Sequence, residues 1–204
     1  MATDVPSSKV GEPAWELATL FPNQGHWSTE DYLLLPGPRL VEFCEGRLEV
    51  LPMPTVWHQM IALCLCLKLR EYAASRDAVL ALMAPLPVRV AEDRFREPDV
   101  VFKFAANLGG GDDRYWDGAD LVMEVVSASK PSHDWETKLA EYAAAGITEY
   151  WIADPRDQSL TVFTLPSGES VYRQNGRYLG DEAAASVLLP GFNVRPADAF
   201  ERPR

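Results

Sequence analysis

The chain has 204 residues, a formal net charge of −11 and a hydrophobic fraction of 47%. This length and apolar content fit one compact domain with a substantial core, and the acidic balance argues against a protein that binds nucleic acid through a generally basic surface. The three cysteines, Cys44, Cys64 and Cys66, form no CxxC pair. Their spacing therefore argues against a disulfide framework and against a structural zinc site.

The N-terminal residues predict a loose arm that precedes a single domain. Residues 1–11 are polar, and residues 1–25 contain several prolines and glycines and show little periodicity. We therefore expect an arm over 1–25 and one domain over 26–204. The chain shows no signal-peptide pattern and no apolar stretch long enough to span a membrane, so we expect a cytoplasmic protein.

The first regular elements are a short helix and a hairpin. Ser28 is placed to cap a short helix that ends before Pro36-Gly37-Pro38. Residues 40–51 then alternate between apolar and polar types and carry turn residues at Glu45-Gly46-Arg47. This pattern predicts a hairpin with Glu42 on its first strand.

A long helix and two strands are predicted next. Thr55 is placed as the N-cap of a helix from Val56 to about Ser75, in which apolar residues recur at helical spacing. Strands are expected near residues 80–90 and 96–104. A Gly- and Asp-rich loop follows over residues 107–117.

The second half of the chain alternates strand, helix and strand. A short apolar run that contains Glu124 predicts a buried strand, and a helix is expected from about Trp135 to Ala145, ended by Gly146. A further strand covers residues 149–154. Short strands follow to residue 200, separated by turn residues that include Asn175-Gly176 and Pro190-Gly191. This order of elements predicts an α/β domain with a mixed central sheet flanked by helices.

Glu124 is the residue with the most evident chemical meaning, because it is a lone carboxylate in a strand that is otherwise apolar. Side chains alternate along a strand, so Glu124 shares a face with Val122 and Val126. Burial of an unpartnered carboxylate costs several kcal/mol, and a metal ion, a lysine or a second carboxylate would reduce that cost. Asp99 upstream and Lys138 downstream are the candidate partners.

Two carboxylates and a lysine predict metal-dependent hydrolysis of phosphodiester bonds. Mg²⁺ or Mn²⁺ bound by oxygen ligands would activate water and neutralise the phosphate. Asp99, Glu124 and the backbone carbonyl of Val125 are the predicted metal ligands. Lys138 would orient or deprotonate the water, or stabilise the developing negative charge. The net negative charge does not exclude this prediction, because a local group of basic residues surrounds the Asp99 strand: Arg89, Arg94, Arg96 and Lys103.

Several segments, in a fixed order, resemble the PD-(D/E)xK nuclease superfamily. They are Glu97-Pro98-Asp99-Val100, Leu121 to Ser127 and Asp134 to Leu139. With Tyr142, Gly146 and the strand Glu149 to Pro155, they are similar to one bacterial restriction endonuclease-like family of largely unknown role. The similarity covers roughly residues 28–192 and includes Glu42, Gly46 and His58. It implies a restriction-endonuclease-like fold with added β-hairpins, a nucleic-acid substrate that we expect to be DNA, and a homodimer with paired sites.

The chain departs from the superfamily pattern at one position. The Glu-x-Lys form of the motif would place lysine at position 126, where this chain has Val126. In the branch that it resembles, the lysine has moved to the following helix, which here points to Lys138. Lys138 lies four residues after Asp134 and four before Tyr142, so the three side chains share a helix face.

Two further residues are auxiliary candidates. Glu42 would reach the site as a further acidic ligand or decorate a face of the hairpin. His58, near the start of the long helix, would contact the substrate or the outer shell of the metal, or have no such role.

A non-catalytic protein on the same fold is the main alternative. It would act as a homodimer or as a binding module, and it would bind no metal. The net charge of −11 and the valine at position 126 favour it.

A two-carboxylate glycosidase is the third interpretation. Glu124 would be its acid and Asp99 its nucleophile, without a metal or a lysine. Replacement of Lys138 by alanine would then have little effect, whereas a nuclease would lose much of its activity.

Overall fold

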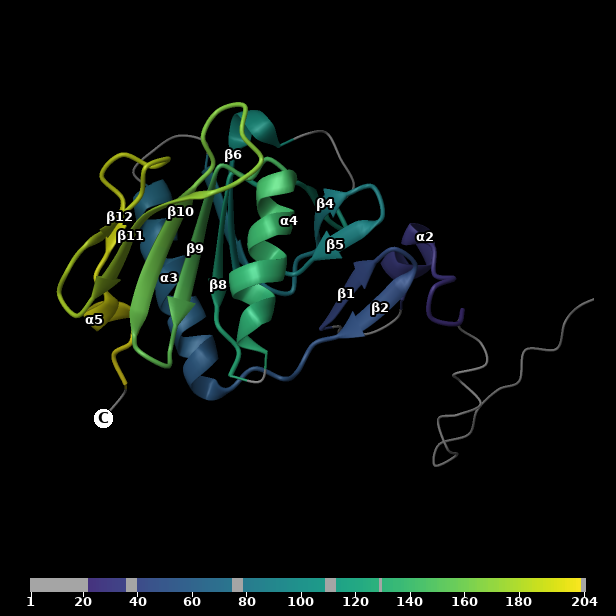
Figure 1. Ribbon diagram of the computed structural model, residues 1–204, viewed down its shortest axis with the longest axis horizontal. Coiled ribbons are helices and arrows are strands. Elements are labelled where there is room, and N and C mark those ends of the chain that lie inside the picture. The colour runs from purple at the N-terminus through teal and green to yellow at the C-terminus, as the bar shows by residue number, and fades with distance from the viewer. Residues whose placement is uncertain (1–21, 36–39, 75–78, 109–112, 129, 203–204) are drawn as a thin grey trace, which may run out of the picture.

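The computed structural model describes residues 22–35, 40–74, 79–108, 113–128 and 130–202. Most of the arm predicted over residues 1–25 lies outside them. The described residues form a six-stranded sheet, a five-stranded sheet and a two-stranded sheet, with helices packed against them (Figure 1). The α/β class with mixed sheets and added hairpins is therefore confirmed.

The six-stranded sheet is the centre of the molecule and has the strand order β11-β10-β9-β8-β6-β3. Strands β8 and β9 run parallel, and the other neighbouring pairs run antiparallel. The parallel pair requires a crossover connection, which the helical segment between its strands provides. The strand bounds are β3 (Val79–Met83), β6 (Val100–Phe104), β8 (Leu121–Val125), β9 (Glu149–Asp154), β10 (Ser159–Thr164) and β11 (Arg173–Leu179).

The five-stranded sheet lies beside the central sheet and has the order β2-β1-β5-β4-β7. Its first two strands form the predicted hairpin. The predicted short helix is α2 (Thr29–Leu33), in which Ser28 and Asp31 form a capping box. Tyr32 of this helix packs on the rings of Phe43 and Phe95, each at 5.4 Å between centroids. The strand bounds are β1 (Val41–Cys44), β2 (Arg47–Val50), β4 (Val88–Ala91), β5 (Arg94–Arg96) and β7 (Trp116–Asp117).

Each of the two strands predicted near residues 80–90 and 96–104 is in fact divided between the two sheets. Pro85 and Pro87 lie in the first gap, between β3 and β4, and Pro98 lies in the second, between β5 and β6. Proline has no backbone N–H to donate to a sheet, so continuous pairing through these positions is unfavourable. The chain therefore crosses between the sheets at both places.

Helices cover both faces of the central sheet (Figure 1). On one face lies α3 (Val56–Ala74), whose predicted cap is confirmed: the Oγ1 atom of Thr55 accepts from the backbone N–H of His58 at 3.1 Å. On the other face lie a π-helical turn, η2 (His133–Lys138), and α4 (Leu139–Ala144). The remaining short elements are η1 (Ala105–Asn107), β12 (Ala184–Ala185), β13 (Asn193–Val194) and α5 (Pro196–Ala199).

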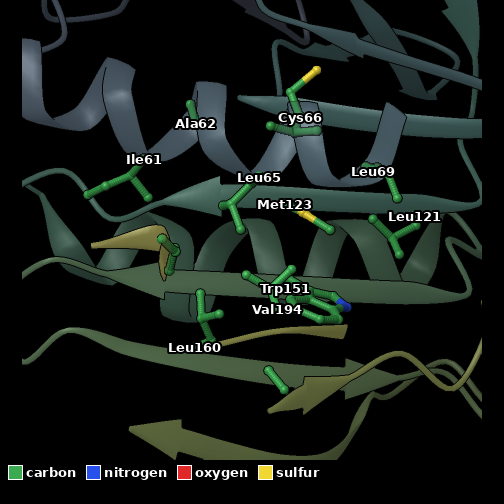
Figure 2. Close-up of a cluster of buried hydrophobic side chains, with 14 of the residues drawn as sticks. Ile61, Ala62, Leu65, Cys66, Leu69, Leu121, Met123, Trp151, Leu160 and Val194 are labelled. Atoms are coloured by element: carbon green, nitrogen blue, oxygen red, sulfur yellow. The ribbon is translucent and has the colours of Figure 1, made fainter. Parts of the chain in front are cut away.

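The larger hydrophobic core lies between α3 and the central sheet (Figure 2). Ile61, Leu65 and Leu69 recur every four residues on α3, and they pack in one cluster with Met123 and Trp151 of the sheet. All five side chains are fully buried. Burial of each side chain stabilises the fold by about 2 kcal/mol, so this layer fixes α3 on the sheet.

The opposite face of the sheet packs against α4 in a second core cluster. Val122 and Val126 belong to this cluster, together with Tyr142 and Tyr150. The alternation of β8 therefore places Glu124 on the α4 side of the sheet, as the sequence predicted.

The turn predicted at Asn175-Gly176 is wrong, because both residues lie within β11. The pairing of this strand with β10 shifts register between Val162 and Phe163. A Cβ atom on Gly176 would lie 2.6 Å from the ring of Tyr178. The glycine thus permits the close approach of that ring within an irregular strand.

Candidate active site

Asp99 and Glu124 lie close together where the start of β6 pairs with the end of β8. Asp99 immediately precedes β6, and its Oδ2 atom accepts from the backbone N–H of Val125 at 2.8 Å. The backbone N–H of Asp99 in turn points at Oε2 of Glu124, at 3.4 Å. Strand pairing thus brings both carboxylates and the Val125 backbone to one place.

His58 reaches the same place from the first turn of α3. Its Nε2 atom lies 3.2 Å from Oδ2 of Asp99 and 3.0 Å from the carbonyl oxygen of Val125. Burial lowers the pKa of His58, but the hydrogen bond and the charge of Asp99 outweigh that effect, so the pKa is raised. The side chain keeps 15% of its surface exposed, so this is the solvent-facing part of the site.

Lys138 lies among three carboxylates. Its Nζ atom is 2.9 Å from Oε1 of Glu124, 3.5 Å from Oε1 of Glu42 and 3.7 Å from Oδ1 of Asp134. Burial lowers the pKa of this lysine, but the surrounding carboxylates more than offset burial and raise the pKa well above its usual range. Lys138 is therefore a buried, charged ammonium group.

The π-helical turn explains how this lysine is surrounded. Its last residue is Lys138, and its wider turn lets side chains four and five positions earlier both point toward the lysine side of the helix. Asp134 contacts Lys138 directly, while Nε2 of His133 lies 3.5 Å from the Glu42 carboxylate that Lys138 also approaches. A regular helix had been predicted here, and the sequence carries no clear signal for the π-turn.

Glu124 is 2% exposed, and the pKa of its carboxyl group is strongly perturbed. Its Oε1 atom accepts from Tyr142 Oη at 2.6 Å as well as from Lys138. Burial, and then the charges of Asp99 and Asp134, raise the pKa of Glu124 to about 8 despite the opposing lysine. Burial is thus the main cause of the raised pKa, and the two neighbouring carboxylates add to it.

Glu42 is fully buried and links the hairpin to Lys138. Its Oε2 atom accepts from Nη1 of Arg96 at 2.6 Å, and its Oε1 atom accepts from the backbone N–H of Glu97 at 3.2 Å. Arg96 also makes a two-pronged contact with Glu141 of α4, at 2.7 and 2.8 Å. Burial raises the pKa of Glu42, but Lys138, His133 and Arg96 hold it well below its usual range.

A second set of ligand atoms lies next to Lys138, in Glu42, Glu49 and His133. One ligand atom from each falls within 4.8 Å of the others, so this group is also a candidate to hold a metal ion. Its carboxylates are already matched by cations, because Arg96 contacts Glu42 and Lys130 contacts Glu49 at 2.9 Å. A further cation would meet electrostatic repulsion from Arg96 and Lys130 there.

The structure brings the predicted site residues together. Asp99, Glu124, Val125 and His58 meet at the edge of the central sheet, and Lys138 connects Glu124 to Glu42. Their catalytic and ligand roles stay predictions. Arg96 was predicted only as part of a basic group, and no role was predicted for Glu49, His133 and Glu141, because their contacts join segments far apart in the chain or depend on the π-turn.

The basic residues around Asp99 are engaged within the protein. Lys103 and Arg96 are buried, and Lys103 donates to the carbonyl of Asp117. On the surface, Arg89 pairs with the Asp117 side chain and Arg94 pairs with Glu45. These residues therefore do not form the free basic surface that phosphate contacts would need.

Comparisons with known proteins agree with this architecture. The model of the Uma2 family, described as "Putative restriction endonuclease", matches residues 29–197. The chain belongs to the Uma2 family. Membership of Uma2 confirms the resemblance read from the motif order in the sequence.

A solved structure shares the Uma2 chain's fold. This "putative nuclease belonging to DUF820" from Anabaena variabilis superposes with a TM-score of 0.68 at 16% sequence identity, covering 84% of this chain and 96% of that one. No curated protein matches the chain. Among the described residues, none of the helices combines the length and the apolar character needed to cross a membrane.

Proposed function

We propose that this chain is a divalent-metal-dependent endonuclease that hydrolyses phosphodiester bonds in DNA. The observation that carries the proposal is the meeting of Asp99, Glu124 and the Val125 carbonyl at one sheet edge, with the ammonium group of Lys138 against Glu124. Family membership supports the nuclease class, and the geometry supports the assignment of roles.

The donor set fits a hard divalent ion such as Mg²⁺ or Mn²⁺. Asp99 and Glu124 would supply carboxylate oxygens and Val125 a carbonyl oxygen, which are the ligands such ions prefer. Burial is the main cause of the raised pKa of Glu124, the charges of Asp99 and Asp134 add to it, and a bound cation would oppose these effects. A bound ion would supply polarisation of the phosphate and a water molecule that ionises near neutral pH.

Lys138 would stabilise the negative charge that develops on the phosphate. Contacts with Glu124, Glu42 and Asp134 keep its Nζ atom protonated, so it is better suited to donate hydrogen bonds than to remove a proton. Its position on η2 replaces the lysine that the superfamily motif places at Val126, whose side chain here packs in the core under α4.

Glu42 would hold this lysine in place. Its carboxylate is fixed by Arg96 and by the Glu97 backbone, and it lies 3.5 Å from the same ammonium group that contacts Glu124 at 2.9 Å. We therefore assign Glu42 a positioning role, in place of the metal-ligand role considered from the sequence.

The alternative is a non-catalytic protein that acts as a homodimer or as a binding module. The acidic chain and the internal pairing of the basic residues near Asp99 favour this alternative. A homodimer is proposed in either case, and apolar side chains on the outer face of α3, Leu63 and Leu67, support it because they are 47% and 56% exposed. Light scattering of the full chain tests the oligomeric state.

The test is cleavage of plasmid, single-stranded DNA and RNA in the presence of Mn²⁺ or Mg²⁺. We expect metal-dependent cleavage of DNA that Asp99→Asn abolishes and Lys138→Ala lowers by about 10²–10³-fold, as for loss of one charge-stabilising donor. Lys130→Ala is the matched control, because Lys130 is an exposed lysine that pairs with Glu49 outside the Asp99 and Glu124 contacts.

The outcomes separate the interpretations. Equal cleavage by wild type and Asp99→Asn would mean a contaminating nuclease. Absence of cleavage together with absence of Mn²⁺ binding would favour the non-catalytic alternative. Cleavage that survives in Lys138→Ala would remove the lysine from the mechanism while leaving the metal site intact.

A further inference from the structure

His58 occupies a position that a hydrogen-bonding role explains poorly. Its Nε2 atom faces two oxygen acceptors at once, Oδ2 of Asp99 at 3.2 Å and the Val125 carbonyl at 3.0 Å. A neutral imidazole has one N–H at that atom and can serve both oxygens only by sharing it. The other ring nitrogen, Nδ1, is buried without a hydrogen-bond partner among the described residues. The two oxygen acceptors therefore place the ring proton on Nε2 in the metal-free protein, and an ion bound at Nε2 would displace that proton.

The two separations from Nε2 have the length expected between neighbouring ligands of one metal ion. In an octahedral site with bonds of about 2.1 Å, adjacent ligand atoms lie about 3.0 Å apart, since the separation is the bond length times the square root of two. The two measured separations from Nε2, 3.0 and 3.2 Å, match this value. An ion between the three atoms would satisfy all of them at once.

We propose that His58 is a direct ligand of the site's divalent ion, through Nε2, and that the site consequently prefers a transition metal such as Mn²⁺ over Mg²⁺. This inference rests on the proposed function, because it uses the same Asp99 and Val125 ligands. Imidazole nitrogen suits transition metals, whereas Mg²⁺ selects oxygen ligands. The start of α3 holds the ring in place, because the Thr55 cap fixes the His58 backbone.

The test is Mn²⁺ binding to the full chain. Calorimetry measures the affinity, and electron spin echo spectroscopy reports the ligands of the bound ion. We expect Mn²⁺ to bind at least about tenfold more tightly than Mg²⁺, with nitrogen modulation in the echo from a histidine ligand. His58→Gln should remove the modulation and weaken Mn²⁺ binding by about tenfold or more, with a smaller effect on Mg²⁺. His133→Gln is the matched control, because His133 is also a partly buried histidine and belongs to the Glu42 and Glu49 group.

Labelling the wild-type chain with ¹⁵N-histidine tests the inference without any substitution that could disturb folding. The label should change the modulation frequencies of the Mn²⁺ spin echo if a histidine binds the ion. Modulation that survives in His58→Gln and disappears in His133→Gln would overturn the inference and place the ion in the other cluster. Mn²⁺ binding that depends on Asp99 but shows no nitrogen modulation would overturn it while leaving the proposed oxygen site standing. Absence of Mn²⁺ binding would count against both.

Discussion

Glu124 and Glu149 are both buried glutamates, and they lie on the two parallel strands at the centre of the sheet. They face opposite sides: Glu124 belongs to the α4 side, whereas Glu149 lies on the α3 side with Trp151. Glu149 is 0% exposed and Glu124 is 2% exposed, so burial does not distinguish them. The partners do.

Glu149 is surrounded by neutral donors. Oε1 accepts from Trp151 Nε1 and Ser186 Oγ, each at 2.6 Å, and Oε2 accepts from the backbone N–H groups of Val187 and Leu188 at 2.7 and 2.8 Å. Four donors complete the carboxylate and fasten the segment before β13 to the sheet. This is a structural use of a buried charge.

In contrast, Glu124 contacts the ammonium group of Lys138, which two other carboxylates also contact. Lys138 also contacts Glu42 and Asp134, and the charge of Asp99 adds to the negative potential. A carboxylate completed by neutral donors has nothing further to bind, whereas one held among other carboxylates is stabilised by an added cation. The comparison thus sets a structural buried acid, Glu149, beside a proposed functional one, Glu124, and the following substitutions test this difference.

Glu124→Gln should give the largest effect. The amide cannot supply the anionic oxygen that faces Asp99, so we expect Mn²⁺ binding to be lost and any metal-dependent cleavage to fall by about 10³-fold or more. The thermal midpoint of the metal-free protein below pH 8 should change little, because the folded Glu124 carboxyl group is then largely protonated and the neutral amide resembles it. Calorimetry and thermal unfolding check the two expectations. Retained Mn²⁺ binding would show that Glu124 is a structural acid like Glu149.

Glu149→Gln should give the opposite result. Its amide group can keep one set of donors satisfied but turns an NH₂ toward the other set, so we expect the free energy of unfolding to fall by about 3 kcal/mol. Mn²⁺ affinity of the folded fraction should stay the same as in the wild type. Urea unfolding measures the stability change. A loss below about 1 kcal/mol would mean that the four donors contribute little net stability at this position.

The stability of the metal-free protein should depend on pH through Glu124. Its pKa is raised from an ordinary value of 4.5 to about 8 in the folded chain. Between these values the folded state holds a proton that the unfolded state has lost, so this contribution to stability is complete below pH 4.5 and declines as pH rises to about 8. Mn²⁺ binding should change in the opposite direction and strengthen over the same range, because the ion displaces the proton.

Thermal unfolding in EDTA from pH 5 to 9 checks this prediction, with Glu124→Gln as the control. The difference in midpoint between wild type and variant should shift steadily in favour of the variant as pH rises. A difference that is independent of pH would mean that Glu124 is already ionised at pH 5.

Tyr142→Phe should give the smallest effect. It removes one hydrogen bond to Glu124 Oε1, which Lys138 continues to contact. We expect a loss of about 1–2 kcal/mol in the free energy of unfolding and a change of only a few-fold in Mn²⁺ affinity. Urea unfolding and calorimetry on the same samples measure both. A loss of Mn²⁺ affinity as large as that of Glu124→Gln would show that the tyrosine, and not the lysine, orients the carboxylate.

Much of the fold was available from local sequence patterns. The cap at Ser28, the hairpin around Gly46, the cap of α3 at Thr55 and the face of β8 that carries Glu124 were all predicted correctly, because each depends on a few neighbouring residues. The order of the motifs also identified the family. Prediction failed where pairing is non-local, as in the strands divided by prolines and in the irregular strand around Gly176.

The sequence by itself determined which residues are proposed to carry the chemistry, since Asp99, Glu124 and Lys138 are recognisable from their types and their strand or helix positions. Only the tertiary structure decided how their charges are distributed. The contacts of Lys138 with Glu42, of Arg96 with Glu141 and of His58 with the Val125 carbonyl join segments far apart in the chain. Periodicity reports which face a side chain occupies, but a buried charge is assigned its role by the groups around it, and packing of the two sheets and α4 brings those groups together.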